Sequence, residues 1–256
     1  MDDGTRAIVE AMEAEVLRLE ADAKLPSEPA LMRQFGVKRH IVRKALAQLE
    51  GRFLVRRVQG AGTFVNSRLD YMLSSGIAPS LHETFALAGG VIRTFVLDAS
   101  VQPVPADVAA CLGPAVGDTS LRLIRLCYLG DELVGYLNEW VSPRVLPEVE
   151  VGLRAYESLT ELFRAAGADP VRSWTRVVPD LTPAPMVTQL AISEPVPAWR
   201  IDTFTKNSND GEPLMVSRGW MRQDRVCISV KYEHDLRPPT CCSTSASVHG
   251  SSRGDS

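Results

Sequence analysis

The order of helix and strand signals in the N-terminal part of the chain is the feature that most constrains its fold. Residues 5–21 repeat apolar side chains at helical spacing, which predicts an amphipathic helix. A second, short helix is predicted to begin at Ser27, a typical N-cap residue, and to run to about Phe35 before Gly36 ends it. The apolar stripe of the first helix consists of Ile8, Met12, Val16 and Leu19.

A third helix and a hairpin complete this pattern. The helix is predicted from Lys38 to about Glu50, and strand-forming residues at 54–58 and 63–65 flank a pair of glycines. Two helices joined by a short turn and followed by a hairpin predict a winged helix-turn-helix domain over residues 1–66. The inward face of the third helix consists of Val42, Ala45, Leu46 and Leu49.

The charges of the chain are strongly segregated. The formal net charge is −3, but residues 33–68 hold nine basic side chains and one acidic side chain, Glu50, so this segment carries +8 and the rest carries −11. Such a positive head attracts a polyanion such as nucleic acid, and a solvated basic helix face is the alternative interpretation. The basic face of the third helix, expected to enter the major groove, consists of Lys38, Arg39, His40, Arg43 and Lys44.

Composition excludes several classes of protein. The chain has no apolar run of about 18 residues, and Asp2 and Asp3 stand where a signal peptide needs a basic start, so we expect a cytoplasmic protein. The five cysteines lack the spacing of a zinc site, and single thiols within apolar runs suit a reducing compartment. We therefore expect neither a metal nor another cofactor.

The N-terminal domain also carries a set of specific motifs. They are Leu25-Pro26-Ser27-Glu28, Phe35-Gly36-Val37, Val42-Arg43-Lys44-Ala45-Leu46, Leu49 and Gln59-Gly60-Ala61-Gly62-Thr63-Phe64-Val65. As a set they resemble the DNA-binding domain of the GntR family of bacterial repressors. The resemblance implies a homodimer on a palindromic operator, although Pro29 and Ala61 replace two arginines usual in that family. The residues it implies for DNA binding are Ser27, Lys38, Arg39, His40, Arg43, Lys44, Gly60, Gly62 and Thr63.

A second domain is expected after the basic head. Residues 67–79 contain Ser, Gly and Pro without periodicity, so we expect a linker there, an acidic domain over residues 80–235 and a disordered tail over residues 236–256. One layout occurs twice in the acidic domain, at 105–141 and at 183–221: a short helix followed by two strands joined at a tight turn. The duplication predicts two half-sheets joined into one antiparallel sheet, and hence an α+β domain.

A further helix is predicted between the two copies, over residues 158–166. Ser158 and Glu161 form a capping box at its start, and the free N–H groups there suit a bound anion. A plain helix cap is the alternative interpretation of Ser158. The inward face of the helix consists of Leu159, Leu162, Phe163 and Ala166.

By layout, residues 74–233 resemble the UTRA domain, the ligand-sensing domain of the HutC branch of the GntR family, with spacing closest to phosphonate regulators of the PhnF type. This resemblance implies an antiparallel sheet related to chorismate lyase, with a small-molecule cleft. Cys127 stands where the family often has a second arginine. The residues implied for effector binding are Arg125, Glu139, Ser158 and Thr160, although Arg125 and Glu139 facing each other as an ion pair is the alternative.

Together these features predict a DNA-binding transcriptional repressor whose operator binding is modulated by a small anionic metabolite. Its expected partners are double-stranded operator DNA, the effector and a second copy of the chain, and not a membrane. Two alternatives stay open: a ligand-independent regulator, because several usual pocket residues are absent, and a chorismate lyase-like enzyme. Since no nucleophile stands beside a histidine base motif, we expect no enzymatic activity.

Overall fold

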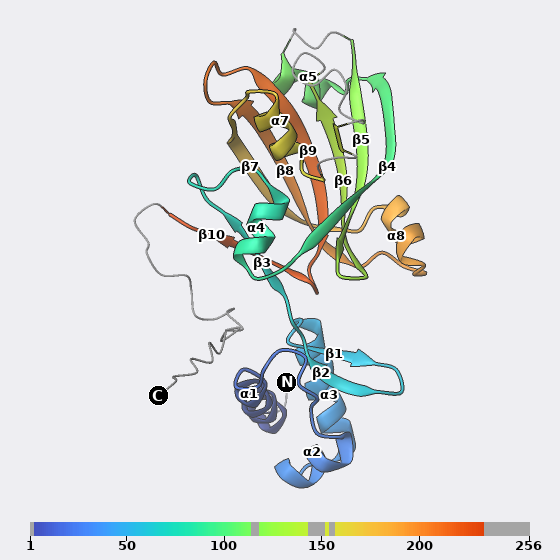
Figure 1. Ribbon diagram of the computed structural model, residues 1–256. Coiled ribbons are helices and arrows are strands. Elements are labelled where there is room, and N and C mark those ends of the chain that lie inside the picture. The colour runs from blue at the N-terminus through green and yellow to red at the C-terminus, as the bar shows by residue number, and fades with distance from the viewer. Residues whose placement is uncertain (1–2, 114–117, 143–151, 154–156, 233–256) are drawn as a thin grey trace, which may run out of the picture. The chain divides into compact units, whose positions relative to one another are not determined.

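The computed structural model describes residues 3–113, 118–142, 152–153 and 157–232 (Figure 1). The described chain forms two compact units that divide after Arg68. The first unit is mainly helical and the second is built on an antiparallel sheet. The α+β class predicted from the sequence is therefore confirmed.

The N-terminal unit is the predicted winged helix-turn-helix. Its elements are α1 (Asp3–Val16), α2 (Glu28–Phe35), α3 (Arg39–Gly51), β1 (Val55–Val58) and β2 (Gly62–Val65). Each boundary has a local cause: the Ser27 hydroxyl accepts from the backbone N–H of Ala30, and Gly36 ends α2 in the left-handed conformation. The core of the unit includes the predicted inward face of α3, whose members are Val42, Ala45, Leu46 and Leu49.

The first helix is shorter than predicted. It ends at Val16 rather than near residue 21, and Leu19 is partly exposed instead of joining the apolar stripe. The reason lies in the next segment: Leu25 N–H donates to the Thr63 carbonyl and Val65 N–H donates to the Ala23 carbonyl. This pairing with the hairpin needs extended backbone, so the helix must end before it.

The C-terminal unit consists of one six-stranded sheet with short helices on both faces, plus a separate pair of strands. Neighbours in the six-stranded sheet follow the order β4-β5-β6-β9-β8-β7, and all of them pair antiparallel. The strands of this sheet are β4 (Ile92–Pro103), β5 (Thr119–Leu129), β6 (Glu132–Val141), β7 (Pro170–Leu181), β8 (Pro197–Asn207) and β9 (Pro213–Arg222). The helices are α4 (Leu81–Leu87), α5 (Ala106–Leu112), α7 (Leu159–Ala165) and α8 (Ala184–Leu190).

The predicted duplication is confirmed, and it extends further than the sequence indicated. The order α4-β4-α5-β5-β6 repeats as α7-β7-α8-β8-β9, and β6 pairs with β9 where the halves meet. Ser80 caps α4 and Ser158 caps α7. The hydroxyl of each serine accepts a hydrogen bond from the backbone N–H three residues later in the chain. Equivalent elements begin at a constant offset in numbering, at Leu81 and Leu159, Ile92 and Pro170, Ala106 and Ala184, and Thr119 and Pro197.

The linker expected at residues 67–79 is corrected by the structure. Residues Leu69–Leu73 form strand β3, which pairs in parallel with β10 (Val226–Val230) and belongs to the C-terminal unit. Tyr71 of β3 packs in the core against Phe85 of α4. The Ser and Gly content of the segment suggested irregular chain. The burial of this aromatic side chain favours a strand instead. The tail predicted at residues 236–256 lies outside the described residues.

The sequence also failed to indicate the two edge strands β4 and β7. Both strands leave most of their side chains partly or fully exposed, and each contains a β-bulge, so neither shows the alternation of a half-buried strand. Edge positions explain this pattern, because only one side of each strand is covered by a neighbouring strand.

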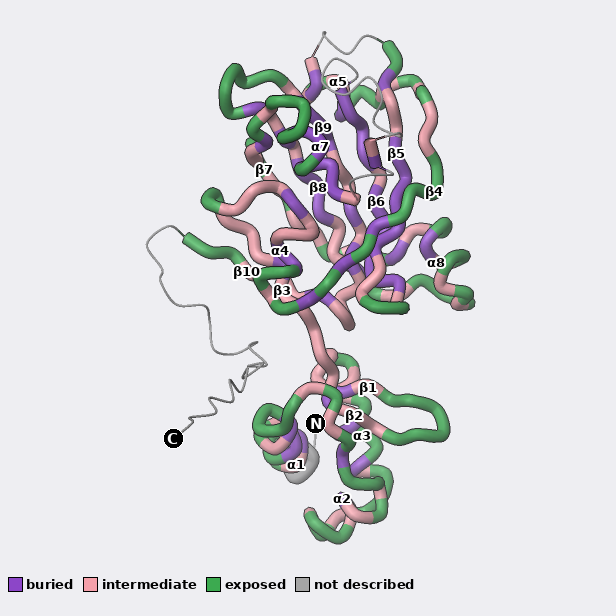
Figure 2. Tube along the Cα trace, in the orientation of Figure 1, coloured by how far each residue is buried: buried purple, intermediate pink, exposed green. Residues whose placement is uncertain are grey.

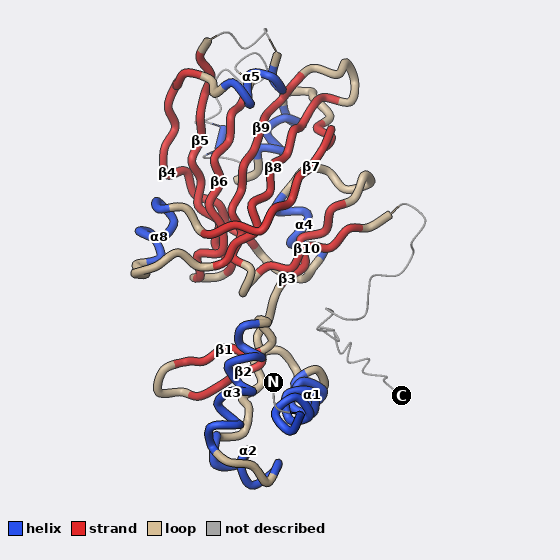
Figure 3. The backbone as a smooth tube through the Cα atoms, turned by 180° about the vertical axis from the view of Figure 1, so that it is seen from behind, coloured by secondary structure: helices blue, strands red, loops and turns tan. Residues whose placement is uncertain are grey.

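The helices divide between the two faces of the sheet (Figure 2). Phe163 of α7 packs with Leu123 of β5, and Phe85 of α4 packs with Leu137 of β6, so α4 and α7 cover one face. On the other face, α5 packs on Trp140 and α8 contacts β6. Seen from behind, α5 and α8 lie toward opposite ends of the strands (Figure 3).

Substituting Phe163 by alanine tests the role of α7 in this core. Because the ring is fully buried, Phe163→Ala is expected to lower the free energy of unfolding of the C-terminal unit by about 3–5 kcal/mol. Leu87→Ala, in the equivalent helix α4 but at a position that is 70% exposed, should change it by less than about 0.5 kcal/mol. Urea titrations followed by circular dichroism measure the free energy of unfolding of both variants. Equal losses would contradict the packing role of α7 in this core.

Candidate functional site

The outer face of α3 is the first candidate site. The five basic residues predicted there are all exposed, while the four apolar residues of the opposite face are buried. The structure thus keeps the predicted charged surface intact and open to solvent along one side of the helix. Its members are Lys38, Arg39, His40, Arg43 and Lys44.

These basic residues differ in whether their charge is already balanced. Arg39 donates from Nε to the Glu28 carboxylate at 3.0 Å, which ties the start of α3 to the start of α2. Lys38, Arg43 and Lys44 have no ion-pair partner within the described residues. Three cations on the exposed face are therefore free to meet anionic groups of a ligand such as DNA.

The wing between β1 and β2 is the second part of this surface. Gly60 and Gly62 both have positive φ, at 76° and 125°, so the turn requires residues without a β-carbon. A β-carbon at Gly62 would also approach the Lys24 side chain to 3.1 Å. Ser27, Gly60 and Gly62 are exposed, and Thr63 is half-buried beside them. The wing residues predicted to approach DNA therefore lie at an accessible tip.

The second candidate site is a cleft between the sheet and the helices α4 and α7. The space inside it amounts to about 40 Å³. All four residues predicted for effector binding line this cleft, so the structure brings them together. They are Arg125 on β5, Glu139 on β6, and Ser158 and Thr160 at the start of α7.

Arg125 and Glu139 form a buried, bidentate ion pair. Nε of Arg125 donates to Oε2 of Glu139 at 2.6 Å, and Nη2 donates to Oε1 at 2.8 Å. Nη1 donates to the Thr94 hydroxyl at 3.2 Å and to the Glu157 carbonyl at 2.9 Å. The alternative raised by the sequence, a mutual ion pair, is confirmed. Four of the five N–H groups of the guanidinium are occupied within the protein.

The surroundings of Arg125 and of the neighbouring Cys127 shift their pKa values. Burial disfavours the charged guanidinium, but the adjacent Glu139 carboxylate outweighs burial and raises the pKa of Arg125. Cys127, two residues along β5, is fully buried, and burial raises the pKa of its thiol to about 12. Cys127 therefore stays a neutral thiol in the core and gives the cleft no replacement for a second arginine.

The helix start contributes hydroxyl groups to the cleft. Ser158 accepts a hydrogen bond from the Glu161 N–H, which confirms its capping role, and Thr160 donates to the Pro79 carbonyl at 3.0 Å. His82 of α4 lines the opposite wall. Burial, and then the positive charge of Arg125, lower the pKa of His82, so its imidazole is neutral at pH 7.

Arg172 on β7 is a cleft residue that sequence reasoning missed. Its Nη1 donates to the Ile77 carbonyl at 2.8 Å, Nη2 approaches the Tyr71 hydroxyl at 3.4 Å, and Nε is buried without a hydrogen-bond partner. No carboxylate lies within ion-pair distance of it among the described residues. The signal that could have found it is the duplication, because Arg172 of β7 is the counterpart of Thr94 of β4, whose hydroxyl accepts a hydrogen bond from Arg125.

The two units together define a DNA-binding regulator: a winged helix with a free cationic face, joined to a sheet domain with a small polar cleft. Comparison with protein families agrees. Residues 5–65 match the family described as bacterial regulatory proteins, gntR family, and residues 87–226 match the UTRA domain. The chain belongs to the GntR family of transcriptional regulators and carries a UTRA domain.

Known relatives give the same result. The chain is 30% identical over 251 residues to the transcriptional regulator Rv0792c of Mycobacterium tuberculosis, covering 90% of this chain and 86% of the relative. It is 29% identical over 201 residues to the regulator GgaR of Escherichia coli K12, covering 78% of each. The crystal structure of PhnF from Mycobacterium smegmatis has the same fold, with a TM-score of 0.58 at 21% identity over 89% of this chain and all of that chain.

These relatives are named as transcriptional regulators, which favours a regulator over the chorismate lyase-like alternative. Among the described residues, no helix has the length and apolar character needed to cross a membrane.

Removing one partner of the buried ion pair tests its structural role. Arg125→Met leaves the Glu139 carboxylate buried and unpaired, so we expect a loss of about 3–5 kcal/mol in the free energy of unfolding. The double variant Arg125→Met/Glu139→Leu removes both charges and should recover most of that loss. Urea unfolding of the three proteins checks this expectation, which fails if the double variant is less stable than the single one.

Proposed function

We propose that this protein is a repressor of the HutC type that binds operator DNA as a homodimer. The observation that carries the proposal is the exposed face of α3, where Lys38, Arg43 and Lys44 have no acidic partner among the described residues. A helix with such a face suits the major groove, and an exposed glycine wing suits the adjacent backbone or minor groove. Two copies related by a twofold axis would read a palindromic site.

The cleft is the proposed effector site. A small polar molecule that meets the hydroxyls of Ser158 and Thr160 would compete for the bond between Thr160 and the Pro79 carbonyl. Release from DNA then requires that the effector binds the DNA-incompetent state more tightly, with a coupling free energy of about 1–3 kcal/mol.

The sequence predicted an anionic effector bound by Arg125. Such an effector needs a different cation. Arg125 is neutralised by Glu139, so it offers little to a second anion. Arg172 lines the same cleft without a carboxylate partner among the described residues, and its Nε has no hydrogen-bond partner. We therefore assign recognition of a single negative charge on the effector to Arg172.

A ligand-independent regulator is the second candidate, and the size of the cleft favours it. About 40 Å³ holds little more than one or two water molecules, so any effector requires the cleft to widen. Thermal-shift screening separates the two candidates, because a true effector raises the melting temperature of the protein that binds it.

A mobility-shift titration on DNA from upstream of the protein's own gene tests operator binding. If Lys44 contacts a phosphate, Lys44→Ala should weaken binding and reduce the slope of log Kd against log salt concentration by about 0.9. Lys231→Ala removes an equally exposed lysine from the C-terminal unit and should leave the slope unchanged. The absence of any retarded species at low salt would refute the proposal.

If Arg172 recognises the effector, a substitution at this residue should separate effector binding from operator binding. For a carboxylate found by the thermal-shift screen, Arg172→Met should abolish both the rise in melting temperature and the release of DNA, while operator affinity stays within about twofold. The neutral amide of the same compound should act poorly on the unmodified protein. A full response of Arg172→Met to the carboxylate would contradict the assignment.

A further inference from the structure

The face of the sheet opposite the cleft carries a second and larger hollow, which we call the back groove. It encloses about 600 Å³, against about 40 Å³ in the cleft. α5 forms one wall, and side chains of strands β5, β6, β9, β8 and β7 form the floor. Its lining combines arginines with two indole rings, the main members being Arg122, Trp140, Trp174, Arg176 and Arg218.

Strand pairing shows how these residues are arranged. They lie on two neighbouring rows that cross five strands, from β5 to β7. Since strands are spaced about 4.8 Å apart, the Cα atoms at the two ends of a row are about 19 Å apart. The first row is Arg122, Trp140, Val216, Phe204 and Trp174, and the second is Ile124, Asn138, Arg218, Asp202 and Arg176.

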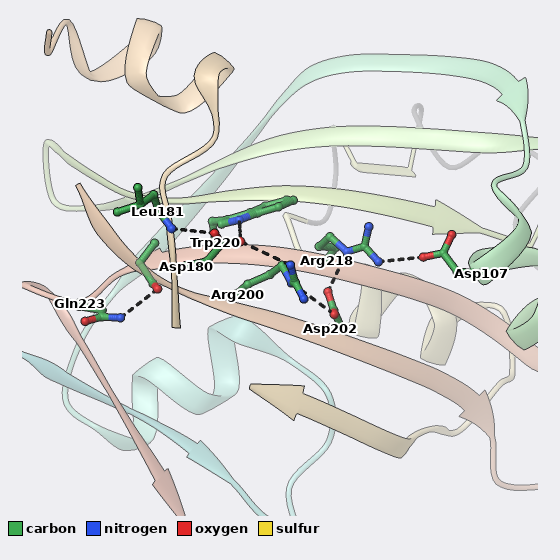
Figure 4. A network of polar contacts seen from close by, with 9 residues as sticks. Asp107, Asp180, Leu181, Arg200, Asp202, Arg218, Trp220 and Gln223 are labelled. Atoms are coloured by element: carbon green, nitrogen blue, oxygen red, sulfur yellow. Dashed lines mark hydrogen bonds and ion pairs between the residues drawn. The ribbon is translucent and has the colours of Figure 1, made fainter. Parts of the chain in front are cut away.

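The middle of the groove is fixed by a network of ion pairs (Figure 4). Arg218 donates from Nε to the buried Asp202 at 2.8 Å and from Nη2 to Asp107 of α5 at 2.9 Å. Arg200 lies 3.5 Å from both Asp202 and Asp180, and Asp180 also accepts from the indole of Trp220. The charge of Arg218 is thereby balanced, and α5 is tied to the sheet.

The two outer arginines are not balanced in this way. Arg122 donates from Nε to the Asn138 side-chain oxygen at 2.9 Å, which fixes its direction without neutralising it. The guanidinium of Arg176 lies 5.8 Å from the centre of the Trp174 ring, which is 39% exposed. Neither arginine has a carboxylate within ion-pair distance among the described residues. The groove therefore holds two uncompensated positive charges, Arg176 beside the exposed indole of Trp174 and Arg122 toward the other end.

We propose that the back groove is a second binding site, for an elongated organic anion with a flat apolar body. The indole of Trp174 offers a stacking surface for the flat body, and the guanidinium groups toward the two ends receive the negative charge. The ion pairs of Arg218 with Asp202 and Asp107 already fix the floor of the groove, so binding does not require the sheet to rearrange. This site lies on the other face of the sheet from the effector cleft, and its residues belong to the C-terminal unit alone.

trans-Stilbene-4,4′-dicarboxylate is a suitable probe, because it is flat and elongated and carries a carboxylate at each end. Isothermal titration of the full chain without DNA should show binding, with stilbene-4-carboxylate binding more weakly and neutral stilbene-4-carboxamide at least about tenfold more weakly still. Arg122→Gln and Arg176→Gln should each raise Kd for the dicarboxylate at least about tenfold. Trp174→Ala should weaken all three ligands. Lys231→Gln removes one exposed charge elsewhere in the unit and should leave Kd unchanged.

Several results would overturn the proposal. One is no heat of binding at millimolar dicarboxylate, and another is an unchanged Kd in both arginine variants, which would place the probe elsewhere. The third is self-association of the chain, measured by sedimentation velocity. If Arg176→Gln and Trp174→Ala both abolish it, the groove receives a second copy of the chain. Arg176 is exposed and its guanidinium lies over the Trp174 ring, so Arg176→Gln should keep its melting temperature and separate lost binding from lost folding.

Discussion

The antiparallel pairing of β6 with β9 is the constraint on which the C-terminal unit depends. Each repeat alone supplies a three-stranded half-sheet with one buried edge, and this pairing joins the halves into one sheet. The register, with Asn138 opposite Arg218, decides which side chains from the two repeats share a face. It places Glu139 and Ser217 toward the cleft and Asn138 and Arg218 toward the back groove. A shift by one residue would exchange the two sets.

The arginines of this unit show that a residue type alone does not define a ligand site. Arg125 has the position expected of an effector ligand, yet its charge is neutralised by Glu139. Arg218 is similarly neutralised by two aspartates. Arg122, Arg172 and Arg176 lack such partners among the described residues, and two of these three lie on the face that the family resemblance did not point to. The balance of each charge against its neighbours is the better guide to where an anion binds.

Much of the fold followed from sequence because its signals are local. Ser27, Gly36 and the apolar spacing of α3 act within one or two helical turns, and the elements they delimit were predicted closely. The four residues predicted for effector binding also lie together, because all of them line the same cleft. Two features could not be settled from sequence. One is β3, which forms against a strand at the end of the domain, and the other is the choice between an ion-paired Arg125 and one free to bind a ligand. An ion pair and a free arginine look identical in sequence, because the difference lies in side-chain positions set by strand register.

The parallel pairing of β3 and β10 has a consequence for how the domain responds to changes at its ends. The strand that enters the domain and the strand that ends the described chain are hydrogen-bonded to each other over five residue pairs, from Leu69 opposite Val226 to Leu73 opposite Val230. Anything that frays β10, such as a deletion or a proline at Ile228, also removes the ladder that holds β3. The end of the domain thereby holds its beginning in place, so a substitution that disrupts β10 also releases β3, the first strand of the C-terminal unit along the chain.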